Sequence, residues 1–253
     1  MVEVEEILRG PYPVYPPDLK FLQGMLAVVP RYQVEGYPEG VFTVDKENVD
    51  RHTRRLIEIW DLTRWPEGID ILWGRRMLWV HDAGEGKSGD TSVVEAMVNK
   101  GKAERVKRAE TAAIQNMLSD TDFRLYKRFE RAKAYWKGNE NHGGDLTAMA
   151  AALVDIICGN LIFHKFMSEH YKITKDQELT EALVQAFNYQ FDEGKVLIQQ
   201  VMKIQDLKVR ECFMEMIREQ FEKTEAFWDN VPKYRIPAVL KLRLEDVAEW
   251  RWE

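Results

Sequence analysis

Cysteine is scarce in this sequence. Cys158 and Cys212 are the only two among 253 residues, and their spacing is not one that binds a metal. This scarcity excludes a fold stapled by disulfides and favours a reducing compartment. The first ten residues, MVEVEEILRG, are acidic and lack a long apolar run, which argues against a signal peptide. We therefore expect a cytoplasmic protein.

An excess of positive charge is also missing. The chain has 36 Lys and Arg against 42 Asp and Glu, a formal net charge of −6. Proteins that bind nucleic-acid polymers usually carry a basic surface, so we expect no such partner. A small anionic substrate is not excluded, because it needs only a local group of basic side chains. With 45% hydrophobic residues, the chain can bury a sizeable core.

Alternating strand patterns, internal repeats and low-complexity tracts are scarce or absent, and helical periodicity dominates, which predicts an all-α fold. Residues 1–20 hold four prolines and predict an extended N-terminal arm. We expect a core over 21–175 and a helical extension over 176–253, packed on the core or forming a dimer interface. Helices are predicted over about 18–30, 47–64, 69–84, 92–118, 121–137, 146–170, 177–204 and 206–228.

A single long apolar run, LTAMAAALVDIICGNLIF, spans residues 146–163 and is long enough to cross a bilayer. Asp155 lies at its centre, where a charge in lipid is costly. Since no second run of this kind exists, we expect a helix buried in protein and no membrane partner. A buried carboxylate needs a compensating metal ion, cation or proton, so Asp155 is a candidate functional residue.

The dipeptide His81-Asp82 follows the apolar stretch MLWV and precedes the glycine-rich segment AGEGKSG. Imidazole and carboxylate groups are both good ligands for divalent ions. Neighbouring residues point about 100° apart on a helix, so both reach one ion only near a helix end. A buried histidine beside a capping aspartate is the alternative interpretation. Glu85 and Asp90 add two acids to the same short segment, HDAGEGKSGD.

The order His52, His81-Asp82 and Asp155 on successive helices resembles the HD-domain metal-dependent phosphohydrolases. HDAGEGKSGD is similar to the corresponding stretch of their 5′-deoxynucleotidase-like branch, which acts on deoxynucleoside monophosphates. Three further segments resemble that branch, namely VPRYQ at 29–33, ENVDRH at 47–52 and KRAETAAIQNML at 107–118. The resemblance covers about residues 18–170 and implies an HD-domain helical bundle with additional C-terminal helices.

The resemblance also implies roles for particular residues. The divalent metal ion (Mn, Co, Mg, Fe or Zn) would be bound by His52, His81, Asp82 and Asp155. Glu85 matches the acid that positions or activates water, and Asp90 matches a second catalytic acid near the sugar. Arg31 matches an arginine that binds the phosphate, and Lys87 is a further candidate for substrate binding.

The expected function is therefore a metal-dependent phosphohydrolase that releases phosphate from deoxynucleoside 5′-monophosphates. Two alternatives stay open: a dNTP triphosphohydrolase, and a non-catalytic HD-type regulatory module. The expected partners are a small nucleotide and a second copy of the chain, because members of this family are often homodimers. His142 and His164 are interpreted as structural residues, as are the tryptophans at helical spacing.

Overall fold

The computed structural model describes residues 13–29, 31, 48–89, 100–139, 143–173, 181–236 and 238–248. Over these ranges the chain forms helices and no strand, which confirms the all-α prediction. The helices are η1 (Pro17–Leu19), α2 (Lys20–Leu26), α3 (Val49–Leu62), α4 (Ile71–Val80), α5 (Glu85–Ser88), α7 (Lys100–Met117), α8 (Asp120–Trp136), α9 (Leu146–Ile173), α10 (Glu181–Val201), α11 (Leu207–Asp229) and α12 (Ala238–Ala248).

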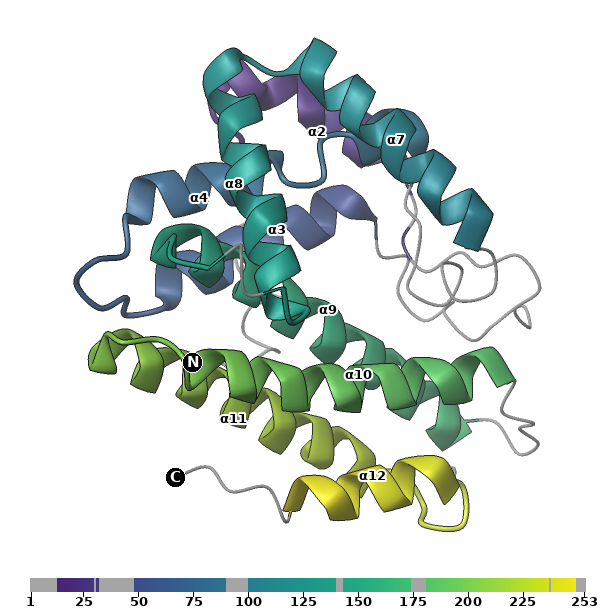
Figure 1. Ribbon diagram of the computed structural model, residues 1–253. Helices are drawn as coiled ribbons and strands as arrows, with labels where there is room; N and C mark the ends of the chain where they lie inside the picture. Colours follow the sequence, from purple (N-terminus) through teal and green to yellow (C-terminus); the bar gives the residue numbers. More distant parts are fainter. Residues whose placement is uncertain are drawn as a thin grey trace.

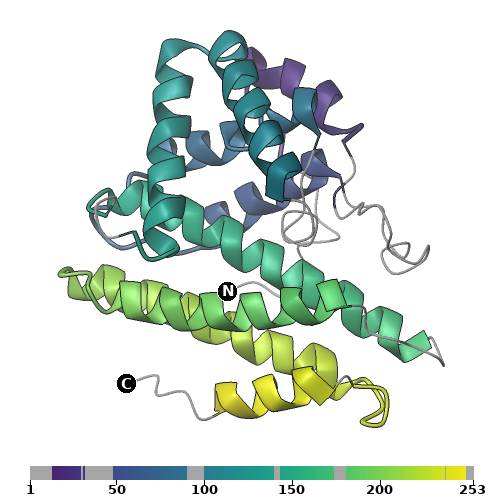
Figure 2. The same cartoon turned by 45° about the vertical axis from the view of Figure 1, so that its right-hand side comes forward.

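The helices form two tiers with α9 between them. Figure 1 shows α2 to α8 in the upper tier and α10 to α12 in the lower one, and the turned view of Figure 2 keeps this arrangement. Helix α9 packs against α3, α4 and α8 on one side and against α11 on the other. Buried apolar side chains from Tyr15 to Leu240 belong to one continuous core. The C-terminal helices therefore share the core of the N-terminal tier, while the domain boundary near residue 175 and the dimer stay predictions.

Polar side chains at the helix starts explain where several helices begin. The side chains of Asn48, Asp70, Ser119 and Asp206 each accept a hydrogen bond from a backbone N–H in the first turn of α3, α4, α8 and α11. Such caps satisfy donors that the helix itself leaves without a partner. At the described end of the predicted N-terminal arm, residues 17–19 form η1 and Tyr15 is buried against Trp79, while the extended arm itself stays a prediction.

Helix α9 is the apolar helix that the sequence predicts. By length and composition its segment Leu146–Glu169 would be able to cross a membrane, but 89% of the apolar window is buried inside the protein. Ala148, Ala151 and Ala152 are fully buried in this helix. Their small side chains let neighbouring helices approach closely, so the acid in the middle of α9 is surrounded by protein.

Helices α3 and α4 make a close contact at a glycine. A Cβ atom built on Gly74 would lie 2.1 Å from the ring of Trp60, far inside van der Waals contact. The indole N–H of Trp60 donates to the carbonyl of Ile71 at 3.0 Å, which holds the ring against α4. Because α3 carries His52 and α4 ends directly before His81, this contact helps to set the spacing of the two histidines.

Replacing Gly74 with alanine is expected to destabilise the protein by about 1–3 kcal/mol, the usual cost of overpacking a filled core. The added methyl group meets a fully buried indole that has no space to move away. Thermal unfolding followed by circular dichroism measures the change. Gly24→Ala in α2 is the matched control, because no atom lies within 4 Å of its added Cβ. Equal melting temperatures for the two variants would contradict the proposed contact.

Candidate metal centre

Three helices bring the four predicted metal ligands together. His52 lies in the first turns of α3, His81 and Asp82 directly follow α4, and Asp155 lies in the middle of α9. All four side chains are buried. The location of the histidine–aspartate pair just past a helix end meets the condition under which adjacent residues can face one ion.

The donor atoms of these residues lie within a few ångströms of one another. His52 Nε2 is 3.0 Å from Asp155 Oδ1, and His81 Nε2 is 3.7 Å from the same oxygen. Asp82 Oδ2 is 2.8 Å from His81 Nε2 and 3.9 Å from His52 Nε2. One ligand atom each from His52, His81 and Asp155 falls within 4.8 Å of the others, so this group could hold a metal ion.

These separations suit a shared divalent ion. Imidazole nitrogens and carboxylate oxygens bind such ions at about 2.0–2.2 Å, so two donors on one ion lie at most about 4.4 Å apart. The measured pairs, from 2.8 to 3.9 Å, fall below that limit. Two imidazoles with two carboxylates form a donor set that suits several of the candidate ions.

The ring of His81 is oriented as a metal-binding histidine usually is. Its Nδ1–H donates to the backbone carbonyl of Leu78 at 2.8 Å. This hydrogen bond leaves Nε2 facing the carboxylates of Asp82 and Asp155, and such partners commonly fix the ring of a metal ligand. His52 differs, because its Nδ1 is buried without a hydrogen-bond partner. The hydrogen bond between its Nε2 and Asp155 therefore orients the His52 ring.

The two carboxylates are charged despite their burial. Burial alone would raise the pKa of Asp155, but the charges of Lys133 and His81 and the hydrogen bond from His52 hold that pKa well below its ordinary value. Burial also opposes the charge on Asp82, and here the adjacent His81, with help from Arg31, keeps the pKa low.

The two imidazoles differ from each other. Burial and the positive charge of Arg31 lower the pKa of His52 to about 4. Burial would also lower the pKa of His81, but the negative charges of Asp82, 2.8 Å away, and of Asp155 raise it to about 9. At neutral pH and without a metal ion, these shifts make His81 a charged imidazolium and His52 a neutral imidazole.

Two cations accompany the carboxylates. Arg31 Nη1 lies 3.3 Å from Asp82 Oδ2, and Lys133 Nζ on α8 lies 2.8 Å from Asp155 Oδ2. Arg31 was a candidate from the sequence, whereas Lys133 was not. The sequence offers one indirect signal for it, because a buried acid in an apolar helix requires a counter-charge from somewhere in the fold.

Of the remaining predicted site residues, the structure describes Glu85 and Lys87 but not Asp90. Glu85 begins α5, one turn past Asp82, and its backbone N–H donates to the Asp82 carbonyl at 3.0 Å. Its side chain is half-buried, while Lys87 on the same short helix is exposed. Asp90 lies outside the described residues, as does His142. The catalytic and substrate-binding roles of Glu85, Asp90 and Lys87 stay predictions.

His164 lies in the core, away from this cluster. It accepts a hydrogen bond from the indole N–H of Trp228 at 3.1 Å and stacks on Phe187. Burial lowers its pKa to about 3, so the ring is neutral at physiological pH. These contacts support its interpretation as a structural histidine.

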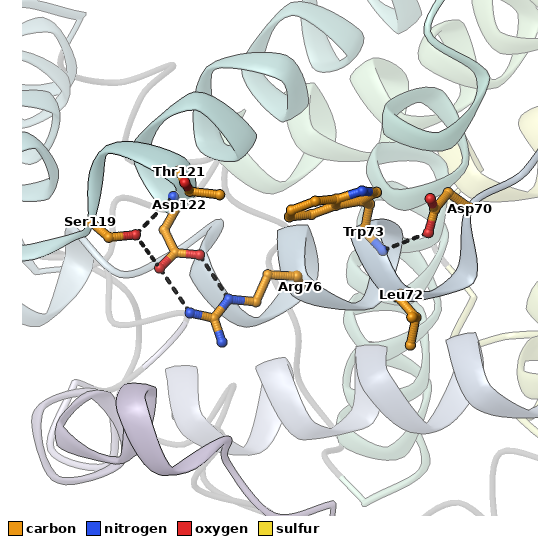
Figure 3. A pocket seen from close by; sticks show the side chains of 7 residues that line it. All are labelled: Asp70, Leu72, Trp73, Arg76, Ser119, Thr121 and Asp122. Atoms are coloured by element: carbon orange, nitrogen blue, oxygen red, sulfur yellow. Dashed lines mark hydrogen bonds and ion pairs between the residues drawn. The ribbon is translucent and has the colours of Figure 1, made fainter.

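A pocket of about 490 Å³ lies at the opposite end of α4, beside the start of α8 (Figure 3). Trp73 and Arg76 reach into it from α4, and Ser119 and Asp122 line it from the α8 side. Arg76 is bound by Asp122 at 2.7 Å and also by Asp18, so its charge is already compensated. The pocket is separate from the histidine–aspartate cluster, which follows the other end of α4.

The raised pKa of His81 predicts a pH-dependent metal affinity. Below about pH 9, an ion must displace a proton from His81 Nε2, so the apparent affinity falls about tenfold for each pH unit. Calorimetric titration with Mn²⁺ between about pH 6.5 and about pH 8.5, in buffers of different ionisation enthalpy, measures both affinity and proton release. The expected release is about one proton per ion. An affinity that does not vary with pH, with no proton released, would contradict this assignment.

Comparisons with known proteins add no further assignment. No family model, curated protein or solved structure matches the chain. The candidate metal centre is therefore supported by its own geometry and by the motif order in the sequence.

Proposed function

We propose that the chain is a metal-dependent phosphohydrolase that acts on nucleotides and releases phosphate from deoxynucleoside 5′-monophosphates. One observation carries the proposal. Residues from α3, the end of α4 and α9, far apart in the sequence, bring two imidazoles and two carboxylates within a few ångströms of one another. These are the same four residues that the motif resemblance assigns to metal binding. The preference for deoxynucleotides derives from the resemblance of HDAGEGKSGD.

In this proposal His52 and His81 bind the ion through Nε2, and Asp82 and Asp155 bind it through carboxylate oxygens. A bound divalent ion supplies charge that polarises a phosphoryl oxygen and favours ionisation of water. The protein contributes the fixed orientation of these donors. The hydrogen bond from His81 to the Leu78 carbonyl and the tight packing around α9 hold them in position before any ion binds.

The other residues act on substrate and water. Arg31, already beside Asp82, presents a guanidinium that can donate two parallel hydrogen bonds to a phosphate. Glu85 accepts a proton from the attacking water, and Asp90 accepts a hydrogen bond from the sugar 3′-hydroxyl. The water oxygen bonds to phosphorus, and the bond from phosphorus to the 5′-oxygen breaks. That oxygen takes up one proton, which balances the proton that Glu85 accepted, and leaves as the nucleoside alcohol. Inorganic phosphate is the second product.

Phosphate release from a panel of deoxynucleoside mono- and triphosphates, each with several divalent ions, tests the proposal. We expect activity on monophosphates that depends on the metal and is lost in Asp82→Asn, because this variant removes a charged ligand. Asp61→Asn is the matched control, since Asp61 pairs with Arg75 on the surface. Triphosphate as the released product would instead favour the triphosphohydrolase. No turnover with any ion would favour a regulatory module.

Glu85→Gln separates proton transfer from metal binding. The variant is expected to keep the metal affinity of the wild type and to lose about two to four orders of magnitude in turnover, the usual contribution of a general base. Steady-state kinetics combined with metal titration measures the two effects. Full activity would remove Glu85 from the mechanism, and loss of metal binding would show that it acts as a ligand instead.

A further inference from the structure

The two oxygens of Asp155 face different partners. Oδ1 lies towards the imidazoles, at 3.0 Å from His52 Nε2 and 3.7 Å from His81 Nε2. Oδ2 lies 2.8 Å from the ammonium group of Lys133 on α8. Lys133 thus neutralises the carboxylate from the side opposite the two rings, and it borders the candidate metal centre without being one of the four ligands.

Asp82 has a similar arrangement. Its Oδ2 lies 2.8 Å from His81 Nε2 and 3.3 Å from Arg31 Nη1. Each carboxylate of the centre therefore lies within 3.9 Å of both imidazoles and of one cation. The side chains of Arg31 and Lys133 are 14% and 32% exposed, whereas both imidazoles are fully buried. Lys133 is the most exposed member of the cluster, so a solute can reach its side chain.

The charges of the two carboxylates and the two cations affect how a metal ion and a phosphate bind together. When both imidazoles bind an ion they are neutral, and the charges of the two carboxylates and the two cations then cancel, so these six side chains together carry no net charge. A divalent ion adds two positive charges that nothing in this group compensates. A phosphate monoester dianion brings two negative charges, so ion and phosphate together restore neutrality. Because unpaired charge in a buried site is costly, each is expected to favour binding of the other.

From this arrangement we propose that Lys133 is a second phosphate-binding residue that changes its partner when the metal ion binds. Without the ion its ammonium group neutralises Asp155. When the ion binds the Asp155 carboxylate, the ammonium group turns to a phosphoryl oxygen of the substrate. A lysine suits this exchange, because its charge is compact, carries three donors and lies on a flexible four-carbon stem. The inference rests on the proposed function and adds a specificity for dianionic phosphate.

Removing the charge of Lys133 is expected to change the affinities for Mn²⁺ and for phosphate in opposite directions. In Lys133→Met the Asp155 carboxylate loses a competitor of the metal ion, so Mn²⁺ binds more tightly than in the wild type. The same variant loses a charge-assisted hydrogen bond to phosphate, so inorganic phosphate binds the Mn²⁺-loaded protein at least about tenfold more weakly. A substitution that merely loosened the structure would weaken both interactions.

Arg128→Met provides a matched control. Arg128 also lies on α8, is 39% exposed and pairs with an aspartate at the start of α9, Asp145, at 2.6 Å. Its removal breaks an ion pair between the same two helices away from the candidate centre, so both affinities should stay at the wild-type value. Lys133→Arg keeps the cation, so it should bind phosphate more tightly than Lys133→Met does.

Calorimetric titration with Mn²⁺, and then with inorganic phosphate at saturating Mn²⁺, measures these affinities in the full chain. Tighter Mn²⁺ binding with weaker phosphate binding in Lys133→Met, and neither change in Arg128→Met, supports the role of Lys133. If Lys133→Met binds both more weakly, or is unchanged in either, that role is wrong while the metal centre stands. If the wild type binds no Mn²⁺ at all, the proposed function itself fails.

Discussion

The burial of two carboxylates, Asp82 and Asp155, is the constraint on which the arrangement of this protein depends. A buried charge without partners would destabilise the fold by several kcal/mol or more. The partners come from separate elements: His52 from α3, His81 from the end of α4, Lys133 from α8 and Arg31 from the segment before α3. Helices that are distant in the sequence must therefore meet at the middle of α9. The apolar core around them excludes water and makes each of these charge pairs stronger than it would be on the surface.

Much of the centre could be predicted because its signals are local. An acid inside a long, mostly apolar run requires compensation wherever that helix is buried, which identifies Asp155 without reference to any other residue. His81-Asp82 lies where an apolar helix meets a glycine-rich break, and a helix end is the place where both residues can face the same point. The ends of the helices are also predictable from nearby residues. Capping residues such as Asn48 and Ser119 mark helix starts, and Trp65-Pro66 marks a break. His52 depended on motif order, since its surroundings look like a helix surface.

The remaining features depend on contacts between distant helices. Helix α8 carries five basic residues, and Lys137 directly follows it. Periodicity alone does not tell which of these six meets an acid on α9: Arg124, Lys127, Arg128, Arg131, Lys133 or Lys137. The contact between Gly74 and Trp60 could not be predicted either, because the sequence does not show which side chain packs on a glycine inside a helix. The electrostatic difference between His52 and His81 also emerges only from their three-dimensional surroundings, in which one ring lies near Arg31 and the other near Asp82.

The central claim is that one divalent ion is bound by two imidazoles and by carboxylate oxygens inside the helical core. An X-ray absorption spectrum of the protein loaded with one equivalent of Mn²⁺ tests it directly, because imidazole rings produce a characteristic outer-shell scattering. The account predicts stoichiometric binding and a spectrum that requires two histidine ligands. A spectrum fitted by oxygen ligands alone, as for an ion on surface carboxylates, or a failure to retain one ion per chain, would contradict it.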